Sequence, residues 1–314
     1  NYPAGMALAM ILLLITLALV FAQWQMLKGR EYVTVTGRGY RPRPMQLGRL
    51  RWVTLAIVVL FLVVDLVLPL GALIVGSFMS VAGVFLPDSF TLAHYGRVFG
   101  DPAFPQVVTN TVVVAVAAAT LGMLLSGLTA YVVVRTRDPL RQPLDVVSWL
   151  PWAIPGIVMG LGLLWAYVFL QRWLPVTLYG TVGLLVIAFL VVGLPLGVRV
   201  MTSTMIQISS DLEESARISG ASWLATVRHV WLPLLRPGFL AGWPILLTLA
   251  VRDLSTIVLL YGPRSQVLSS RLFDWWQGGF VEEGVVLGLV QAAIVLSAFG
   301  LAHLLGQRRL VGTS

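Results

Sequence analysis

Polar residues gather in the stretch 209–233, which interrupts an otherwise apolar part of the chain. Three carboxylates stand near its start: Asp211, Glu213 and Glu214. Carboxylates suit the positive end of a helix, and Arg217 follows Glu213 at the four-residue spacing of a favourable ion pair on a helix surface. Gly220 is the residue type that ends helices in a left-handed conformation. The pattern predicts a short helix over 211–219 whose acidic surface can pair with a basic group of another protein.

A second short helix is expected after Gly220. Ser222 is a good N-cap residue, and the residues that follow it favour a helix over 223–231. Pro233 is expected to end that helix, because proline lacks the backbone N–H that a helix interior needs. Two short helices joined at a glycine make a compact knob.

Motifs of common enzyme sites are missing from the sequence. It contains no G-x-x-x-x-G-K-[ST] loop for ATP phosphates, no H-E-x-x-H and no G-x-S-x-G. Cysteine is absent, which excludes disulfides and thiolate metal sites. The histidines, His94, His229 and His303, lie in three different regions, whereas metal ligands need convergent spacing. We therefore expect neither a catalytic site nor a metal site.

The composition places these residues in a membrane protein. Hydrophobic residues make up 58% of the 314 residues and charged residues 11%, whereas soluble domains carry roughly a quarter charged residues. A helix of roughly 20 residues crosses a bilayer, and isolated strands would leave backbone groups unpaired in lipid. Long apolar runs occur at 4–23, 52–79, 107–134, 147–170, 180–200, 239–260 and 284–306. The sequence predicts an all-α integral membrane protein with about seven transmembrane helices.

Lysine and arginine set the expected orientation, since they concentrate in cytoplasmic loops. The basic segments, expected in the cytoplasm, are 24–51, 135–146, 201–237 and the C-terminal tail. The segments expected outside are 80–106, 171–179 and 261–283, which hold few basic residues. One orientation satisfies every loop, and it places the polar stretch in the cytoplasm.

Two adjacent charges, Arg252 and Asp253, fall inside the predicted span 239–260. Charges in a span are costly and usually face a cavity or a partner. Neighbouring residues on a helix point about 100° apart, so the two are not an ideal mutual pair. Burial among neighbouring helices and a place on a gate or translocation path both stay open. Asp65, in the span 52–79, is a candidate partner for Arg252.

Prolines interrupt several predicted spans: Pro151, Pro155, Pro195 and Pro244. Prolines kink helices, and broken helices can line transport paths. Kinks are therefore expected in these spans. Pro155 joins Asp65, Arg252 and Asp253 as a candidate for the path or gate.

The polar stretch also follows a longer pattern. Glu214-Ser215-Ala216 is followed by three residues, Gly220, nine residues, Val230, one residue and Leu232-Pro233. This order resembles the cytoplasmic coupling loop of ABC-transporter permeases, whose pattern is E-A-A, three residues, G, nine residues, I, one residue, L-P. The sequence departs from that pattern only at Ser215 and Val230. The alternative is an ordinary interfacial helix pair between two spans.

The resemblance implies a MetI-like ABC permease domain whose coupling loop docks on a separate ATPase. The residues that would make or position this contact are Glu213, Glu214, Ala216, Arg217, Gly220, Ala221, Leu232 and Pro233. No cofactor is then expected on this chain, because ATP and Mg would bind the partner ATPase.

The sequence YVTVTGRGYRPR, at 32–43, resembles the linker between the two halves of fused permeases of the ferric-iron type. On that resemblance, 1–23 holds the last transmembrane helix of a preceding permease half. Residues 24–51 form a basic cytoplasmic linker, which is also a candidate surface for anionic lipid. Residues 52–314 form a six-helix permease domain with the coupling loop at 201–237. The segment 261–283 resembles the outer loop that contacts the binding protein.

These resemblances imply the permease subunit of an ATP-driven importer in the bacterial inner membrane. Its expected partners are an ATPase dimer, a second permease half and a periplasmic or lipid-anchored binding protein, with no nucleic acid. Ferric iron is the leading substrate; polyamine, thiamine, phosphonate and sulfate importers use similar permeases. A secondary transporter is the more distant alternative, in which Asp65 or Asp253 would couple to an ion.

Overall fold

The computed structural model describes residues 48–307, except 82, 85–86, 174–176 and 210, together with a few positions between 10 and 25. The predicted span 4–23, apart from those few positions, and most of the linker 24–51 lie outside the described residues. The predicted total of about seven spans is therefore not confirmed.

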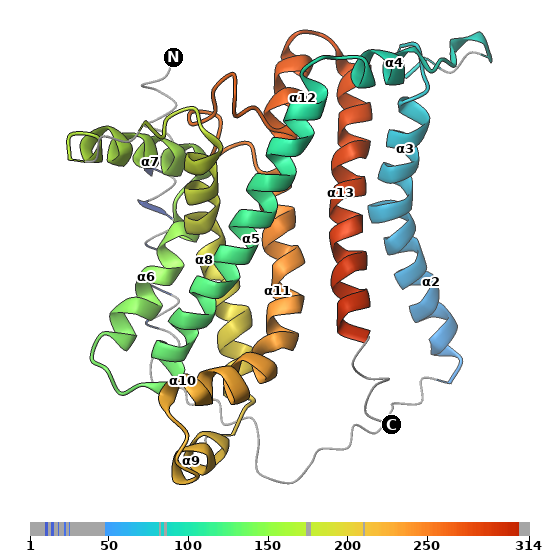
Figure 1. Ribbon diagram of the computed structural model, residues 1–314. Coiled ribbons are helices and arrows are strands. Elements are labelled where there is room, and N and C mark those ends of the chain that lie inside the picture. Colours follow the sequence, from blue (N-terminus) through green and yellow to red (C-terminus); the bar gives the residue numbers. More distant parts are fainter. Residues whose placement is uncertain are drawn as a thin grey trace.

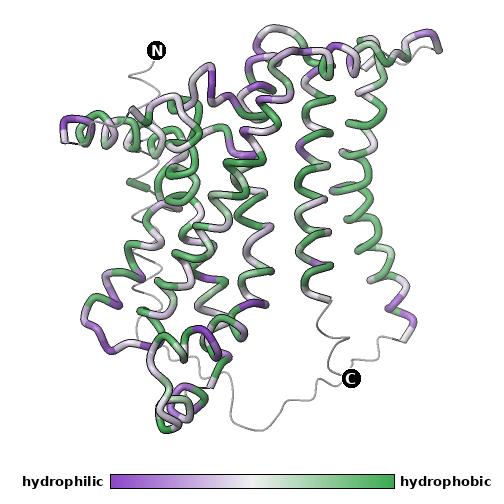
Figure 2. Tube along the Cα trace, in the orientation of Figure 1, coloured by the Kyte–Doolittle hydropathy of each residue, from purple (hydrophilic) through white to green (hydrophobic). Residues whose placement is uncertain are grey.

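Long apolar helices dominate the described part of the chain (Figure 1). Five helical stretches there are long and apolar enough to cross a membrane. They are α2–η1–α3 (Leu50–Leu62, Val63–Val67 and Leu68–Gly76), α5 (Phe104–Arg135), α8 (Val182–Ile206), α10–η3–α11 (Trp223–Thr226, Val227–Trp231 and Leu232–Arg252) and α13 (Val281–Gln307). Hydrophobic residues run along these helices, and hydrophilic residues collect at their ends (Figure 2). The all-α membrane fold is confirmed.

A bent helix pair accounts for the predicted span 147–170. Helices α6 (Arg141–Ala153) and α7 (Gly156–Leu170) meet at 116°, so the chain breaks here where a kink was expected. Proline disfavours the helical conformation in the residue before it. Ile154, before Pro155, is accordingly extended at φ −97° and ψ 124° and ends α6. Pro151, Pro195 and Pro244, by contrast, lie inside helices.

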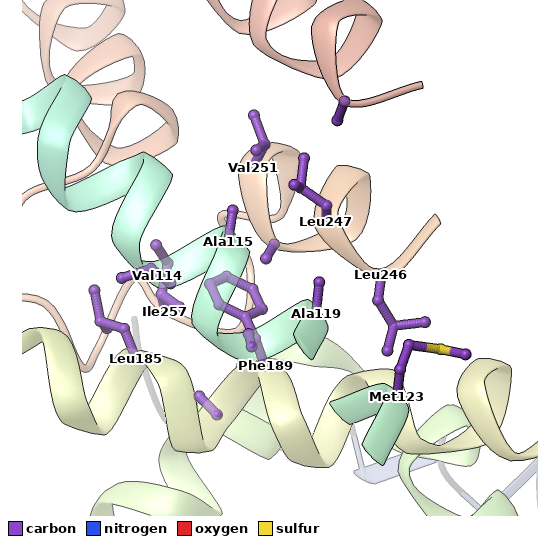
Figure 3. Packing of buried hydrophobic residues seen from close by; sticks show 14 of the residues in the cluster. Val114, Ala115, Ala119, Met123, Leu185, Phe189, Leu246, Leu247, Val251 and Ile257 are labelled. Carbon is purple, nitrogen blue, oxygen red and sulfur yellow. The ribbon is translucent and has the colours of Figure 1, made fainter. Parts of the chain in front are cut away.

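Helices α5, α8 and α11 pack together around the main hydrophobic core. Figure 3 shows Val114, Ala115 and Ala119 converging with Phe189 and with Leu246, Leu247 and Val251. Small residues allow this close packing, as is usual between helices in membranes. A Cβ added to Gly197 would come within 2.2 Å of the Ser126 Oγ, and one added to Gly242 within 2.5 Å of the Met123 Cε.

The predicted span 239–260 is wrong at its C-terminal end. Helix α11 begins at Leu232 and ends at Arg252, and residues 253–260 form turns instead of helix. The Asp253 side chain explains the C-terminal end, because short polar side chains that bond nearby backbone compete with helix. One Asp253 oxygen accepts hydrogen bonds from the Ser255 backbone N–H at 2.9 Å and the Ser255 hydroxyl at 2.7 Å.

Pro233 does not end a helix, which corrects the predicted end of the helix over 223–231. The chain stays helical from Trp223 to Arg252. Pro233 lies inside this continuous helix, at the second residue of α11. The preceding segment, Val227–Trp231, is π-helical, so the hydrogen-bond register changes just before the proline.

The short helices gather at the two ends of the long ones. Helices α9 (Asp211–Ile218) and α10 lie at one end, where α2 begins and α13 ends (Figure 1). Helices α4 (Ala93–Phe99) and α12 (Leu268–Gln277) lie at the opposite end, together with the short turn η2 (Pro87–Ser89). Segments predicted to share one side of the membrane therefore lie at the same end of the molecule.

Candidate functional site

The knob at one end of the molecule is formed by α9, Gly220 and α10. The predicted helix over 211–219 is confirmed as Asp211–Ile218. Gly220 has a φ of +81°, a left-handed conformation that side chains rarely adopt. The Ala221 N–H donates to the Ala216 carbonyl at 3.0 Å across this turn. The Ser222 hydroxyl then caps α10 by accepting from the Ala225 N–H at 3.3 Å.

The predicted coupling residues divide between the knob and the start of α11. Glu214 is exposed, whereas Glu213, Ala216 and Ala221 are half-buried. The backbone of Arg217 lies in α9, but its side chain is outside the described structure, so its pairing with Glu213 stays a prediction. The exposed pair Leu232 and Pro233 lies in the first turn of α11. The pattern thus covers one continuous projecting region.

Exposed apolar side chains on the knob escaped the sequence analysis. They are Leu212, Ile218, Trp223 and Leu224, with exposures of 48%, 87%, 59% and 69%. Large apolar side chains that project from a polar segment mark protein contacts. Their signal in the sequence was the recurrence of large apolar residues within an acidic stretch.

The break between α6 and α7 packs against the turns that follow α11. A Cβ on Gly156 would lie 2.2 Å from the Ser255 Oγ, and one on Gly160 would lie 2.2 Å from the Thr256 carbonyl oxygen. The structure therefore brings Pro155, which directly precedes Gly156, close to the chain that follows Asp253. Two interrupted spans meet here, and interrupted helices are typical of substrate paths in transporters.

Arg252 and Asp253 differ in their surroundings at this junction. The Asp253 carboxylate is half-buried and accepts from Ser255 and from the Thr256 hydroxyl, the latter at 2.5 Å. Arg252 is exposed, and no ion pair of its side chain occurs within the described part of the chain. The two side chains do not pair with each other, as their positions on a helix predicted.

Asp65 lies apart from the other path candidates. It belongs to the π-helical turn Val63–Val67 in the middle of the span Leu50–Ser77, and its side chain is exposed. The described residues contain no ion pair between Asp65 and Arg252, so the suggested partnership stays a prediction. The most apolar part of this span has none of its residues buried in the chain.

Helix α12, at the opposite end of the molecule, is held by hydrogen bonds to the segment that precedes it. The Asp274 carboxylate accepts from the Tyr261 hydroxyl at 3.0 Å and from the Gln266 side-chain amide at 2.5 Å. Burial of Tyr261 and this hydrogen bond to Asp274 raise the pKa of Tyr261 to about 12. Trp276, at 61% exposure, projects from the helix and is available for a contact.

Within the described residues, no group of three or more His, Cys, Asp or Glu side chains is arranged to hold an ion. His94 instead lies 3.1 Å from a Glu283 oxygen through its Nδ1. Arg97 donates to the same oxygen at 2.7 Å. This cluster joins α4 to the start of α13.

Known proteins resemble this chain in both sequence and fold. The family profile described as "Binding-protein-dependent transport system inner membrane component" matches residues 118–311. A ferric transport system permease protein of Actinobacillus pleuropneumoniae is 29% identical over 304 residues, which cover 94% of this chain and 43% of that protein. A putative 2-aminoethylphosphonate transport system permease protein of Salmonella paratyphi A is 30% identical over 73% of this chain and 84% of its own length.

Solved structures of other transporters share the fold of this chain. The permease fold of a bacterial ABC transporter that imports alginate matches 83% of this chain with a TM-score of 0.67 and 17% identity. The chain spans less than half the length of the ferric-transport relatives that it matches. The chain belongs to the family of binding-protein-dependent transport system inner membrane components, the membrane permeases of ABC importers.

Proposed function

We propose that this chain imports ferric iron as part of a permease that a separate ATPase dimer drives through the loop 209–233, which contains the knob. The observation that supports this proposal best is the knob itself. Its acidic helix, its left-handed Gly220 and its exposed apolar side chains project from one end of the molecule. In the membrane-embedded family to which the chain belongs, such a projection is a suitable contact for a soluble motor protein.

The knob offers two kinds of contact to the ATPase. The exposed Glu214 can pair with a basic group, while Ile218 and Leu224 can enter an apolar depression. Buried apolar anchors surrounded by polar contacts supply most of the affinity at protein interfaces. ATP and Mg would bind to the ATPase, so this chain needs to supply only the docking surface.

The outer end is the proposed contact for a substrate-binding protein. There α12 carries the exposed Trp276, and Asp274 holds the helix to the segment that precedes it. Tryptophan is enriched among the residues that dominate protein contacts. A loaded periplasmic or lipid-anchored binding protein would deliver its substrate here, and the interrupted spans at Pro155 and Asp253 would border the path.

A second permease half is the proposed partner of the exposed span Leu50–Ser77. The ferric-transport relatives are more than twice as long as the segment they share with this chain. An unpaired charge in the middle of a span is costly, and Asp65 occupies such a position. A hydrogen-bond donor of the second half, fused upstream or on a separate chain, would compensate for that cost.

Ferric iron is preferred as substrate because the ferric-transport relatives match along most of this chain. A 2-aminoethylphosphonate substrate is the second candidate, supported by a relative that this chain covers for 84% of its length. The likeness to the solved importers concerns the fold alone.

Uptake in the source cells tests both the class and the substrate. Radioactive ferric iron, 2-aminoethylphosphonate and spermidine are supplied separately to a strain lacking this gene and to the complemented strain. Iron uptake that requires this chain and the phosphate-binding lysine of the partner ATPase supports the proposal. Restoration of phosphonate or spermidine uptake alone refutes the iron assignment, and uptake that survives the lysine substitution refutes ATP-driven coupling.

A further inference from the structure

Arg135, the last residue of α5, holds the two chain segments that carry the knob. The Nη2 of Arg135 donates to the backbone carbonyl of Met205 at 2.9 Å and also to the backbone carbonyl of Ile208. The Met205 carbonyl lies in the last turn of α8, and Ile208 lies two residues beyond the helix, just before the knob begins. The last carbonyls of a helix lack partners within it, and an arginine side chain is well suited to bind them.

The same guanidinium contacts the segment that leaves the knob. Its central carbon lies 4.9 Å from the ring centre of Trp231, which is 3% exposed. Tyr131, one helical turn before Arg135 on α5, packs edge-on against the Trp231 ring at 5.7 Å. The Trp223 Nε1 donates to the Tyr131 hydroxyl at 3.4 Å. One turn of α5 is therefore attached to both the entry and the exit of the knob.

The other end of α5 is attached to the outer segment. The Asn110 side-chain amide donates to the carbonyls of Arg264 and Gln266 at 3.0 and 2.9 Å. The Thr111 hydroxyl accepts from the Leu268 N–H, the first residue of α12, at 2.8 Å. A single helix of 32 residues thus connects the base of the knob with the segment proposed to meet the binding protein.

We propose that Arg135 is the positioning residue that transmits movement of the knob to α5, and through Asn110 to the outer segment. This inference rests on the proposed docking of an ATPase at the knob. Coupling between distant sites requires a contiguous, rigid element that both sites can move. Helix α5 meets that requirement, since it packs along α8 and α11 throughout the core. Arg135 is the side chain that joins it to both arms of the knob.

Lysine cannot replace Arg135 in this role. Lysine retains the positive charge, but a compact ammonium lacks the planar fork that binds carbonyls while stacking on an indole ring. Arg137 provides the matched control, because it is an exposed arginine of the same cytoplasmic segment. The test therefore compares Arg135→Lys with Arg137→Lys in the assembled complex of permease and ATPase.

Two cysteine probes separate movement of the knob from movement of α5. The sequence contains no cysteine, so each probe is unique. Ser219→Cys reports on the knob, and Thr109→Cys reports on the far end of α5; both positions are exposed. The labelling rate of each probe is measured with and without ATP, together with uptake and ATP hydrolysis per complex.

The expected result is uncoupling. In Arg135→Lys, ATP still changes labelling at Ser219→Cys, but the change at Thr109→Cys is lost and uptake falls while hydrolysis continues. Arg137→Lys keeps both changes and its uptake. An ATP response at Thr109→Cys that survives Arg135→Lys overturns the inference, and so does loss of assembly without uncoupling. Absence of any ATP response at Ser219→Cys in the otherwise unchanged complex contradicts the proposed function itself, and the transmission role with it.

Discussion

Gly160 of α7 and Thr256 lie in direct contact, so that a Cβ on Gly160 would come within 2.2 Å of the Thr256 carbonyl oxygen. This contact joins two interrupted spans, one broken at Pro155 and the other ended at Asp253. Backbone carbonyl groups freed from helices are acceptable inside a membrane only where protein or water satisfies them. The junction therefore places a backbone carbonyl group of one span against the helix of the other, where protein surrounds it.

Gly160→Ala should destabilise the folded permease. The atom nearest to the added methyl group is the Thr256 carbonyl oxygen, which belongs to the backbone and cannot move away by a side-chain rotation. Overpacking of this kind costs about 1–3 kcal/mol. Thermal unfolding in detergent measures the loss. Gly162→Ala is the control, since no atom lies within 4 Å of the added Cβ. Equal stability of the two variants would contradict the close junction.

Asp253→Ala should lower the amount of folded protein, whereas Arg252→Ala should lower uptake. Asp253 accepts several local hydrogen bonds, and donors left unsatisfied cost about 1–3 kcal/mol, so its replacement should lower the amount of folded protein. Arg252 is exposed at the end of α11, and its replacement should lower uptake per folded complex. Quantified complex and uptake are measured for each variant. Reduced yield with normal uptake in Arg252→Ala would exclude it from the path.

Tyr261 should make the stability of the outer end sensitive to alkaline pH. Its pKa rises from 10.0 to about 12 in the folded protein. The unfolded chain therefore releases this proton first, so stability is retained below pH 10.0 and falls between pH 10.0 and about 12. Tyr261→Phe should lose this component of the fall when unfolding is followed against pH. Tyr179→Phe, at a position that is 52% exposed, should leave the profile unchanged.

Gly220 should tolerate asparagine but not valine. Its φ of +81° is a conformation that asparagine adopts far more readily than a β-branched residue. No atom lies within 4 Å of an added Cβ, so backbone strain, not collision within the chain, distinguishes the variants. ATPase stimulation in the reconstituted complex should fall in Gly220→Val and largely persist in Gly220→Asn. Equal coupling in both would show that the left-handed turn is not needed for docking.

Asp65→Leu should weaken assembly of the complete permease, because it removes the polar group proposed to pair with the second half. Asp65→Asn keeps a hydrogen-bonding side chain and should assemble better. Val64→Leu, at the exposed neighbouring position, controls for a change in apolar bulk. Co-purification of the two halves under mild detergent is the measurement. Tighter assembly of Asp65→Leu would show that this carboxylate faces lipid.

Local chemistry made part of this structure predictable from the sequence. The N-terminal acids, Gly220 and Ser222 are close neighbours in the chain, and the helix, turn and cap that they predict are all present. The long apolar runs in the sequence likewise located most of the spans. The end of α11 was predictable in principle, because Asp253 is followed closely by Ser255 and Thr256, but the long apolar run concealed it.

Contacts between distant segments could not be predicted in this way. Arg135 bonds to carbonyls 70 and 73 residues further along the chain. Carbonyl groups belong to every residue, so no sequence pattern identifies which of them an arginine will reach. The meeting of Gly160 with Thr256 likewise depends on how whole helices pack.

Helix α11, which leaves the knob, has the shape of a lever. Its 21 residues, Leu232–Arg252, correspond to a rod of roughly 30 Å. A tilt of about 5° at the knob would move the far end of such a rod by about 3 Å, by the same helix dimensions. That far end carries Arg252 and lies by the junction with α7, so a small rotation that the proposed ATPase imposed on the knob would become a displacement as long as a hydrogen bond. Because the chain stays helical through Pro233, no hinge separates the knob from this lever.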